Sequence, residues 1–403
     1  MKNTIKFLAI TAAALLSFAA CEKDNKDADE LTSYEQAIKD AAGKYVENVI
    51  YTTYGKLADA GTLLYNDLVA LRDAETLTQA AIDKACADFL AARSFWEKSE
   101  AFLFGAATDF NIDPHIDSWP LDRQRLAKNL SNESVIADLL EEGAGAIDEV
   151  GASALGFHGI EFILFRDGAN RTVAALQANE TAPEFAAFKV SGKNELIFAA
   201  AVAEDLMISL YQLNVSWNAD APKAQQDAVE EAELNCTVNG TSKSYGENML
   251  GAAVKGSTYA TWQEVAQTVI SAGCANIANE VFATKMGQAN SGEDPSYIES
   301  PYSKKSFVDF YDNIVSIRSS LYGAFDATTA ASDSFLAFLN KHHKSEAAKI
   351  ESTLKAALDA LQACIDSKVA FVDNPKAATV DKAIDAVSAL NDALEEASAA
   401  IKD

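Results

Sequence analysis

Apolar residues recur at intervals of three and four through most of the chain, which is the spacing of amphipathic α-helices. Thr78 precedes one such stretch as a suitable N-cap, and Gly105 is a natural stop after it. Clusters of proline, glycine and polar residues predict loops at 109–121, 170–188 and 287–303. The pattern predicts helices at about 33–64 and beyond, 78–104, 135–150, 153–165, 193–217, 261–285, 306–321, 332–369 and 379–402.

These helices fall into two groups, so the expected fold class is all-α, with two four-helix bundles in tandem. The chain is rich in Ala, Leu, Glu and Lys and holds only 7 prolines and 19 glycines in 403 residues, which suits long helices. We predict a first bundle at 33–217, a connection at 218–244 and a second bundle at 245–403.

The amino-terminal segment has a different pattern. Lys2 and Lys6 precede an apolar run that is too short to span a bilayer as a stable helix, which predicts a signal peptide at 1–20. Two alanines before Cys21 resemble a bacterial lipobox, so we expect lipidation at Cys21 and a disordered polar tether at 21–32. The alternative is ordinary signal cleavage with an incidental cysteine. The expected location is the bacterial cell envelope, as an outer-membrane lipoprotein on the periplasmic side or at the surface.

The charge balance excludes some partners. The chain holds 33 Lys and Arg against 59 Asp and Glu, a net charge of −26. Phosphates would be repelled, so nucleic acid is not an expected partner, and the membrane should be met only through the anchor at Cys21. No C-x-x-C pair is present, which argues against a structural zinc site. Cys86, Cys274 and Cys364 lie in helical patterns and are expected to be buried free thiols.

The strongest candidate for chemistry is the stretch 156–161, which reads Gly-Phe-His-Gly-Ile-Glu between apolar flanks. On a helix, His158 and Glu161 are one turn apart and share a face. Imidazole and carboxylate groups are good ligands for transition metals. The alternative is that Glu161 only hydrogen-bonds His158 or a nearby backbone amide in a helix core.

Glu100 is the best additional metal ligand. If the predicted helix continues to Gly105, Arg93, Trp96 and Glu100 share one of its faces. The alternative is a local ion pair between Arg93 and Glu100, with Trp96 filling the core.

Two loops supply further candidates for the wall of a pocket. Asp117 and Trp119 lie in a proline-bounded loop, where Trp119 either covers a site or plugs the edge of a core. Glu299 and Ser303 lie at the end of the long loop 287–303, and long loops are often functional. The alternative for Ser303 is the N-cap of the next helix.

Catalytic readings have less support. A zinc peptidase of the usual kind would need H-E-x-x-H, whereas this chain has one histidine in the motif and three others at 115, 342 and 343. A nucleophilic enzyme would need a paired base, and only His158 is expected to be buried. Proteolysis therefore stays as an alternative function.

The chain resembles the imelysin-like proteins, a family once classed as metallopeptidases on the strength of a G-x-H-x-x-E motif. The resemblance covers most of the chain and depends on the order and spacing of several short fragments. They lie at 93–96, 99–102, 104–105, 116–122, 156–162, 279–281 with Lys285, 299–303, 312–314 and 322–323.

The resemblance implies paired four-helix bundles with a cleft between them and an association with bacterial iron uptake. It also implies roles for Arg93, Trp96 and Glu100, which match the family's R-x-x-W-x-x-x-E pattern. The expected function is the binding of iron, or of a small iron-bearing ligand, in partnership with iron-uptake membrane proteins. The alternatives are a metallopeptidase and a non-catalytic surface scaffold. The predicted metal ligands are His158, Glu161 and Glu100, and the predicted pocket residues are Arg93, Trp96, Asp117, Trp119, Glu299 and Ser303.

Overall fold

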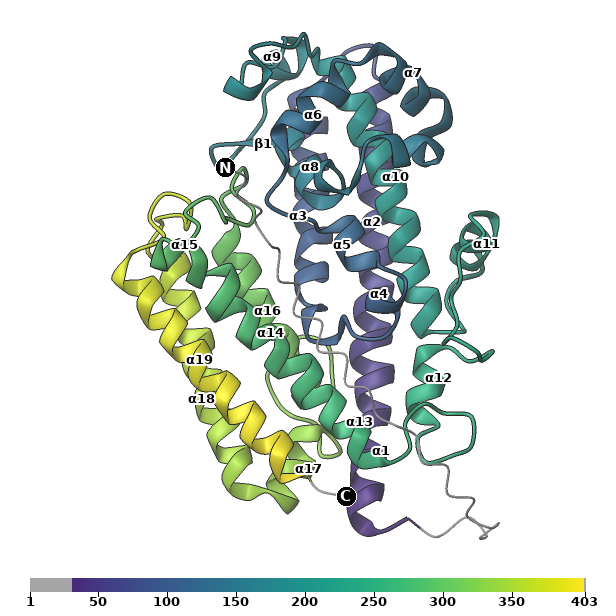
Figure 1. Cartoon of the computed structure of the whole chain (residues 1–403), viewed down its shortest axis with the longest axis vertical. Helices are drawn as coiled ribbons and strands as arrows, with labels where there is room; N and C mark the ends of the chain where they lie inside the picture. The colour runs from purple at the N-terminus through teal and green to yellow at the C-terminus, as the bar shows by residue number, and fades with distance from the viewer. Residues whose placement is uncertain (1–30, 402–403) are drawn as a thin grey trace, which may run out of the picture.

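A computed structural model describes residues 31–401 of the chain (Figure 1). The expected all-α class is confirmed: within this range the strands are β1 (Phe165–Arg166) and β2 (Ala169–Asn170), which pair as a short hairpin. The predicted signal peptide at 1–20 and the lipidation site Cys21 lie outside the described residues.

The first half of the chain is built around three long helices, α2, α3 and α10, which pack side by side with α2 in contact with both others. Shorter helices cover one end of this group. The elements are α1 (Ser33–Lys44), the π-helix η1 (Tyr45–Ile50), α2 (Tyr51–Asp73), α3 (Gln79–Glu97), η2 (Glu100–Phe102), α4 (Ala106–Asp109), α5 (Ile112–Ile116), α6 (Arg123–Leu130), α7 (Glu133–Glu142), η3 (Gly143–Glu149), η4 (Ala152–Ala154), α8 (Gly156–Leu164), α9 (Val173–Gln177), η5 (Pro183–Phe185) and α10 (Gly192–Trp217).

Helix α10 is the apolar centre of this half. It is long and apolar enough to cross a membrane by length and composition, but 72% of its most apolar window is buried inside the protein. It packs against α2, α8 and η3. The hydrophobic run of α10 is therefore that of a helix in the core of a bundle.

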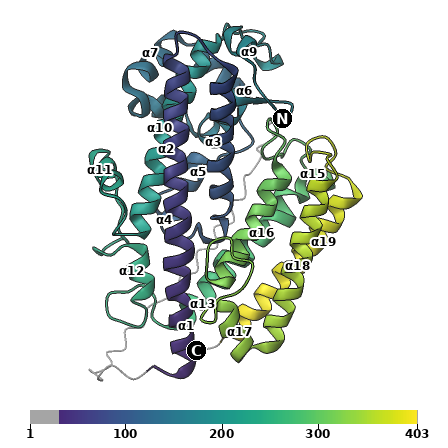
Figure 2. The same cartoon turned by 180° about the vertical axis from the view of Figure 1, so that it is seen from behind.

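The second half contains four long helical segments, the first of which alternates between α- and π-helix from Trp262 to Lys285. Helices α18 and α19 form an antiparallel pair, and α16 and the segment ending in η7 complete the group (Figures 1 and 2). The elements are α11 (Lys223–Glu231), α12 (Tyr245–Leu250), α13 (Trp262–Gln267), η6 (Thr268–Ala275), α14 (Asn276–Asn279), η7 (Glu280–Lys285), α15 (Gly287–Ser291), α16 (Ser306–Tyr322), α17 (Phe335–His342), α18 (Lys344–Asp366) and α19 (Ala378–Ala400).

The two halves share a wide contact. Helix α1 continues into α2 as one rod (Figure 2), and its first part packs on α13 and α17 of the second half. Helix α16 packs across α3 and η2 of the first half. The division of the chain into domains at residues 217 and 245 stays a prediction.

One predicted helix is interrupted, and two predicted loops contain helical turns. The predicted helix 332–369 is broken between α17 and α18 at His343, whose backbone is not helical. Its Nε2 lies 2.8 Å from the hydroxyl of Tyr34 on α1, so a contact between distant segments holds the break. The expected loops at 109–121 and 287–303 also contain short helices, α5 and α15.

Helix α3 begins after the predicted N-cap, because the Thr78 hydroxyl accepts from the Ala81 amide, but it ends at Glu97 rather than near Gly105. The Ser99 hydroxyl donates to the Trp96 carbonyl at 2.6 Å. Polar contacts of this kind compete with the helical hydrogen bonds. The chain then turns through η2, which packs on α16.

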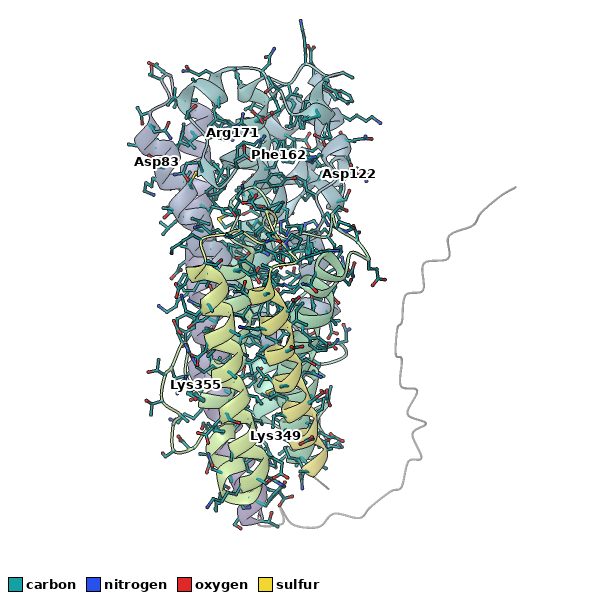
Figure 3. The ribbon with its side chains drawn as sticks, turned by 90° about the vertical axis from the view of Figure 1, so that its left-hand side faces the viewer. Asp83, Asp122, Phe162, Arg171, Lys349 and Lys355 are labelled. Carbon is teal, nitrogen blue, oxygen red and sulfur yellow. The ribbon has the colours of Figure 1, made fainter. Side chains whose placement is uncertain are left out.

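A buried ion pair holds the segment that follows α8. Arg171 Nη1 donates to Glu195 Oε1 of α10 at 2.7 Å, and the Phe162 ring stacks on Phe185 with centroids 5.4 Å apart. Figure 3 places Phe162 and Arg171 in the bundle above α18, which carries Lys349 farther down. These contacts enclose α8 in protein.

The first glycine of the motif permits the close approach of α8 to α5. Gly156 has a φ of +63°, and a Cβ at this position would lie 1.8 Å from the Ile116 carbonyl oxygen. Only glycine adopts this backbone conformation without strain. Gly156 therefore brings the start of α8 against the segment that carries Asp117.

Replacing Gly156 by alanine should lower the free energy of unfolding by about 2–5 kcal/mol, since the left-handed backbone and the clash with Ile116 both act against the folded state. Urea denaturation followed by circular dichroism measures the change. The matched control is Gly55→Ala in α2, where a Cβ would meet nothing within 4 Å. This control should raise stability by up to about 1 kcal/mol. Equal stability of the two variants would contradict the close contact at Gly156.

Candidate functional site

Every residue of α8 is buried, including both polar residues of the motif. The chain is extended at Leu155 before the helix and at Phe165 after it, so α8 is a short apolar helix enclosed by protein. His158 is 2% exposed and Glu161 is 1% exposed. Since bulk water does not reach these groups, protein atoms or a bound ion must satisfy them.

His158 lies beside carboxylates from two segments of the chain. Its Nε2 is 3.1 Å from Asp117 Oδ1, and its Nδ1 is 3.7 Å from Glu161 Oε2. Within the described residues Nε2 has no aligned hydrogen bond. Burial lowers the pKa of His158, but the adjacent carboxylates of Asp117 and Glu161 outweigh burial and raise the pKa to about 9. The ring therefore faces negative charge from both sides.

Asp117 follows α5 and is shared by three partners. Arg93 Nη1 pairs with its Oδ1, and Trp96 Nε1 donates to its Oδ2 at 2.7 Å. Burial raises the pKa of Asp117, but the charges of Arg93 and His158 hold it well below the ordinary range. Asp117 is therefore an ionised acid between a guanidinium and an imidazole.

Arg93 connects α3 to the long loop of the second half. Its Nη2 pairs with Glu97, one turn farther along α3, and with Glu299 Oε1 at 2.6 Å. The local ion pair considered from the sequence is thus made with Glu97 instead of Glu100. Glu100 lies in η2, beyond the end of α3, and does not share the face of Arg93 and Trp96 because the helix has ended.

Lys285 is a second buried cation in this cluster and is 1% exposed. It ends the π-helix η7, and its Nζ lies 3.1 Å from Glu299, 3.6 Å from Glu100 and 3.7 Å from Glu97. Burial lowers the pKa of Lys285, but these carboxylates raise it well above its ordinary value. A permanent ammonium therefore neutralises part of the acidic cluster.

Ser303 holds the motif glutamate. Glu161 Oε1 accepts from the Ser303 hydroxyl at 2.6 Å, from the Ser303 amide at 2.7 Å and from the Tyr302 amide at 3.2 Å. The alternative role of Ser303 as an N-cap is wrong, because α16 begins at Ser306 and Lys305 occupies the position before it. Glu161 Oε2 has no partner within the described residues and lies on the side of His158.

Glu299 and Asp309 complete the cluster from the second half. Glu299 Oε2 has no partner among residues 31–401, and burial raises the pKa of Glu299 to about 7, with Lys285 acting against this. Asp309 accepts from the Ser300 hydroxyl at 2.5 Å, and burial raises its pKa well above the ordinary value. Both groups can therefore hold a proton near neutral pH.

The buried cluster has more acidic than basic groups. Its acids are Glu97, Glu100, Asp117, Glu161, Glu299 and Asp309, and its bases are Arg93, His158 and Lys285. Even with His158 protonated, the acids are in excess, so the site has capacity for protons or for a further cation.

Two groups of side chains have the geometry to hold a metal ion. The ligand atoms of Asp117, His158 and Glu299 lie within 4.8 Å of one another, and so do those of Glu97, Glu100 and Asp117. Ligands on opposite sides of a first-row metal are about 4 Å apart, twice a bond length of about 2 Å, so small movements suffice. A cation here would take the place of a proton on His158 and would satisfy Glu299 Oε2, which has no hydrogen-bond partner in the described part of the chain.

A cleft of about 740 Å³ leads to the cluster from the surface between the two halves. Its polar lining includes Glu100, Asp113, Asp117, Glu280 and Lys285. Burial raises the pKa of Asp113 to about 7, with neighbouring carboxylates adding to the effect. The cleft therefore offers acidic groups along the path to the buried site.

Trp119 lines the same cleft and is half-buried. Its ring centroid lies 4.1 Å from that of Tyr297, in the loop that carries Glu299. This contact joins the predicted pocket loops, one from each half, at the rim of the cleft.

The structure thus brings the predicted pocket residues together around His158, with Glu100 placed nearer to Lys285 and the cleft. Reasoning from the sequence did not assign a site role to Glu97, Lys285 or Asp309, although Lys285 was among the positions that carry the resemblance. Glu97 carries a usable signal, its position one turn after Arg93. Asp309 carries none, because its role depends on long-range packing of the second half.

Comparisons with known proteins agree with this architecture. Iron-regulated protein A of Synechococcus elongatus is 25% identical over 269 residues, which cover 67% of this chain and 60% of that protein. The chain therefore matches less than two thirds of the length of that relative. A solved structure from Parabacteroides distasonis, described as an iron-regulated protein A precursor, has a TM-score of 0.73 at 22% identity, covering 94% of this chain and 98% of that one.

An imelysin-like protein of Psychrobacter arcticum has a TM-score of 0.55 at 12% identity, covering 93% of this chain and 95% of that one. These two structures show the same fold. The model of the Imelysin family matches residues 50–397, which is most of the chain. The resemblance seen in the sequence is confirmed, and the chain belongs to the Imelysin family.

Proposed function

We propose that this protein binds a metal ion, iron above all, at the buried site around His158 and serves bacterial iron uptake. The observation that carries the proposal is the grouping of Asp117, His158 and Glu299, whose ligand atoms lie within 4.8 Å of one another. An imidazole with two carboxylates suits first-row transition metals. Buried donor atoms without partners, such as Glu299 Oε2, are rare unless something satisfies them.

The surrounding residues have positioning roles in this proposal. Arg93 and Trp96 orient Asp117 from α3. Ser303 fixes one oxygen of Glu161 and leaves the other beside His158 Nδ1, where it can set the orientation of the ring. These contacts would preorganise the donors before the ion arrives.

Glu100 belongs to the entry path in this proposal. It lines the cleft and forms, with Glu97 and Asp117, the second group of closely spaced carboxylates. An ion that enters from the cleft would meet this group first. Asp117 is common to both groups and would pass the ion toward His158.

The assignment of iron depends on relatives and not on the donor set, which suits manganese or zinc as well. Two relatives are named iron-regulated protein A. The cleft of about 740 Å³ also has room for a small iron-bearing ligand, which is the alternative form of the cargo. Membrane proteins of iron uptake are the proposed partners.

We also propose that the protein is an outer-membrane lipoprotein anchored at Cys21. The support comes from the sequence alone, from the two lysines, the short apolar run and the two alanines before the cysteine. A lipid anchor would leave the folded part free to bind its cargo at the membrane surface.

Replacing His158 by alanine should weaken metal binding by at least about 10- to 100-fold. Loss of a residue that only orients a metal ligand already has an effect of this size, and His158 is proposed to be a ligand itself. Calorimetric titration with Fe²⁺ under anaerobic conditions, together with metal analysis of the purified protein, measures the effect. The matched control is His342→Ala on α17, which should bind as the wild type does. Equal, stoichiometric binding by His158→Ala would reject His158 as a ligand. A lower melting temperature with unchanged binding would favour a purely structural role.

Replacing Lys285 by methionine should destabilise the metal-free protein by about 3–5 kcal/mol, because the buried acids lose their counter-ion. Added Mn²⁺, as an air-stable substitute for Fe²⁺, should then raise the melting temperature of this variant more than that of the wild type. The control is Lys349→Met, whose exposed ion pair with Glu396 should change stability by no more than about 1 kcal/mol. Equal metal-induced shifts in all three proteins would show that Lys285 and the metal do not share the same acids.

Peptidase activity is the alternative function, and the proposal predicts that it is absent. The purified protein should not cleave a mixed peptide library, with or without a chelator. Ser303 already occupies one oxygen of Glu161, and the site has one imidazole, unlike the two of a zinc peptidase. Cleavage that a chelator abolishes and that Glu161→Gln removes would replace the binding function with a catalytic one.

A further inference from the structure

A second cavity, of about 900 Å³, lies away from the His158 cluster on the outer side of the first half. Residues of α5, η3, α10 and α11 line it. Figure 1 shows α11 standing beside α10 at the outer edge of the molecule, and the two helices are in contact. The size is within the usual range of about 300–1,000 Å³ for small-ligand sites.

Apolar side chains form part of this cavity. They are Phe110, Ile112, Met207, Ile208 and Leu234. Leu234 is 37% exposed, which is unusual for a large apolar residue in this protein. An occupant with hydrocarbon surface would cover it and gain from the removal of apolar area from water.

The polar lining is strongly acidic. Among the described residues it contains no Lys or Arg, and the one basic residue among them, His115, is already paired with Asp205 at 2.9 Å. Glu204 accepts from the Tyr65 hydroxyl at 3.2 Å and from the Ala144 amide at 3.0 Å. These two acids are therefore satisfied by the protein.

Three further acids of the lining, Glu142, Asp148 and Glu231, are exposed and have no hydrogen-bond or ion-pair partner among residues 31–401. They come from α7, η3 and α11, so three separate elements each contribute a free carboxylate. An occupant with several positive charges would be attracted to all three.

Ser209 adds a polar group that lacks a partner. It lies on α10 in the lining of the cavity and is 8% exposed. Its hydroxyl forms no hydrogen bond with another group in the described part of the chain. The hydroxyl is therefore available to an occupant of the cavity or to water.

We propose that this cavity binds a linear aliphatic polyamine. The ammonium groups of such a ligand would pair with Glu142, Asp148 and Glu231, and its methylene segments would lie on the apolar side chains. A bare divalent cation would leave the apolar surface uncovered, and a neutral apolar ligand would leave the carboxylates unpaired. A polyamine fits both, because charged groups and hydrocarbon segments alternate along its length.

Calorimetric titration of the full-length protein with spermidine at low ionic strength tests the proposal. The double variant Asp148→Asn/Glu231→Gln should bind at least about tenfold more weakly, since each charge-assisted hydrogen bond is worth about 1.5–3 kcal/mol. The matched control is Glu149→Gln/Glu230→Gln, which removes the same charge at neighbouring positions outside the lining. The control should stay within about twofold of the wild type, because Glu149 and Glu230 do not line the cavity and would not contact its occupant.

Equal weakening by the two double variants would overturn the proposal, since it would mean that spermidine responds only to the net charge of −26. Displacement of spermidine by an equal concentration of Mg²⁺ would also overturn it and indicate an inorganic cation site. The His158→Ala variant should bind spermidine as the wild type does. This separates failure at the cavity from failure at the metal site, because each site has its own variant and its own probe.

Discussion

The buried guanidinium of Arg93 is the interaction on which the arrangement of the two halves depends. It pairs with Glu97 on its own helix, with Asp117 after α5 and with Glu299 from the second half, and its Nε lies 3.9 Å from Asp309 of α16. A charge without water needs partners on every side, and loss of a partner in such a network costs about 3–5 kcal/mol. Four segments of the chain must therefore be placed correctly at once. An apolar core of the same volume would be as stable, so the retention of these charges points to function.

The cluster is not a closed structural network. The acids outnumber the bases, and two features of the structure lessen the effect of the excess negative charge. Burial raises the pKa of Glu299 to about 7, and the Ser300 hydroxyl donates to Asp309. Neither feature supplies a hydrogen bond to Glu299 Oε2, Glu161 Oε2 or His158 Nε2, which have none within the described residues. The ion pair of Arg171 and Glu195 on the far side of α8 also leaves one atom without a hydrogen bond, Glu195 Oε2, whereas the cluster around His158 leaves several. The larger number of free atoms around His158 supports a binding site there.

The sequence allowed much of the fold to be predicted and only part of the site. Helices such as 193–217 were found because burial of one face leaves a periodic pattern, and the all-α class followed. The early end of α3 was not foreseen, because it depends on contacts of Ser99 and η2 with other segments. That single difference moved Glu100 away from Arg93. His158, Asp117 and Glu299 were identified through the motif, the loops and the resemblance. Lys285 was noted only as a position of the resemblance, and its pairing with the buried acids became visible when the second half was folded against the first.

The two acidic sites of this protein would select cations by different physical means. Around His158 the donors are buried and already share two internal cations, so an incoming ion must lose its water and form strong, directional bonds. In the cavity beside α10 the free carboxylates are exposed and apolar side chains form part of the lining, so shape and hydrocarbon surface matter more than desolvation. A net charge of −26 attracts every cation to the surface alike. Selectivity must therefore arise from the bonds and contacts that each site offers to a cation once it is bound. The site around His158 favours a small ion that readily loses its water, whereas the cavity beside α10 favours a long, flexible polyamine.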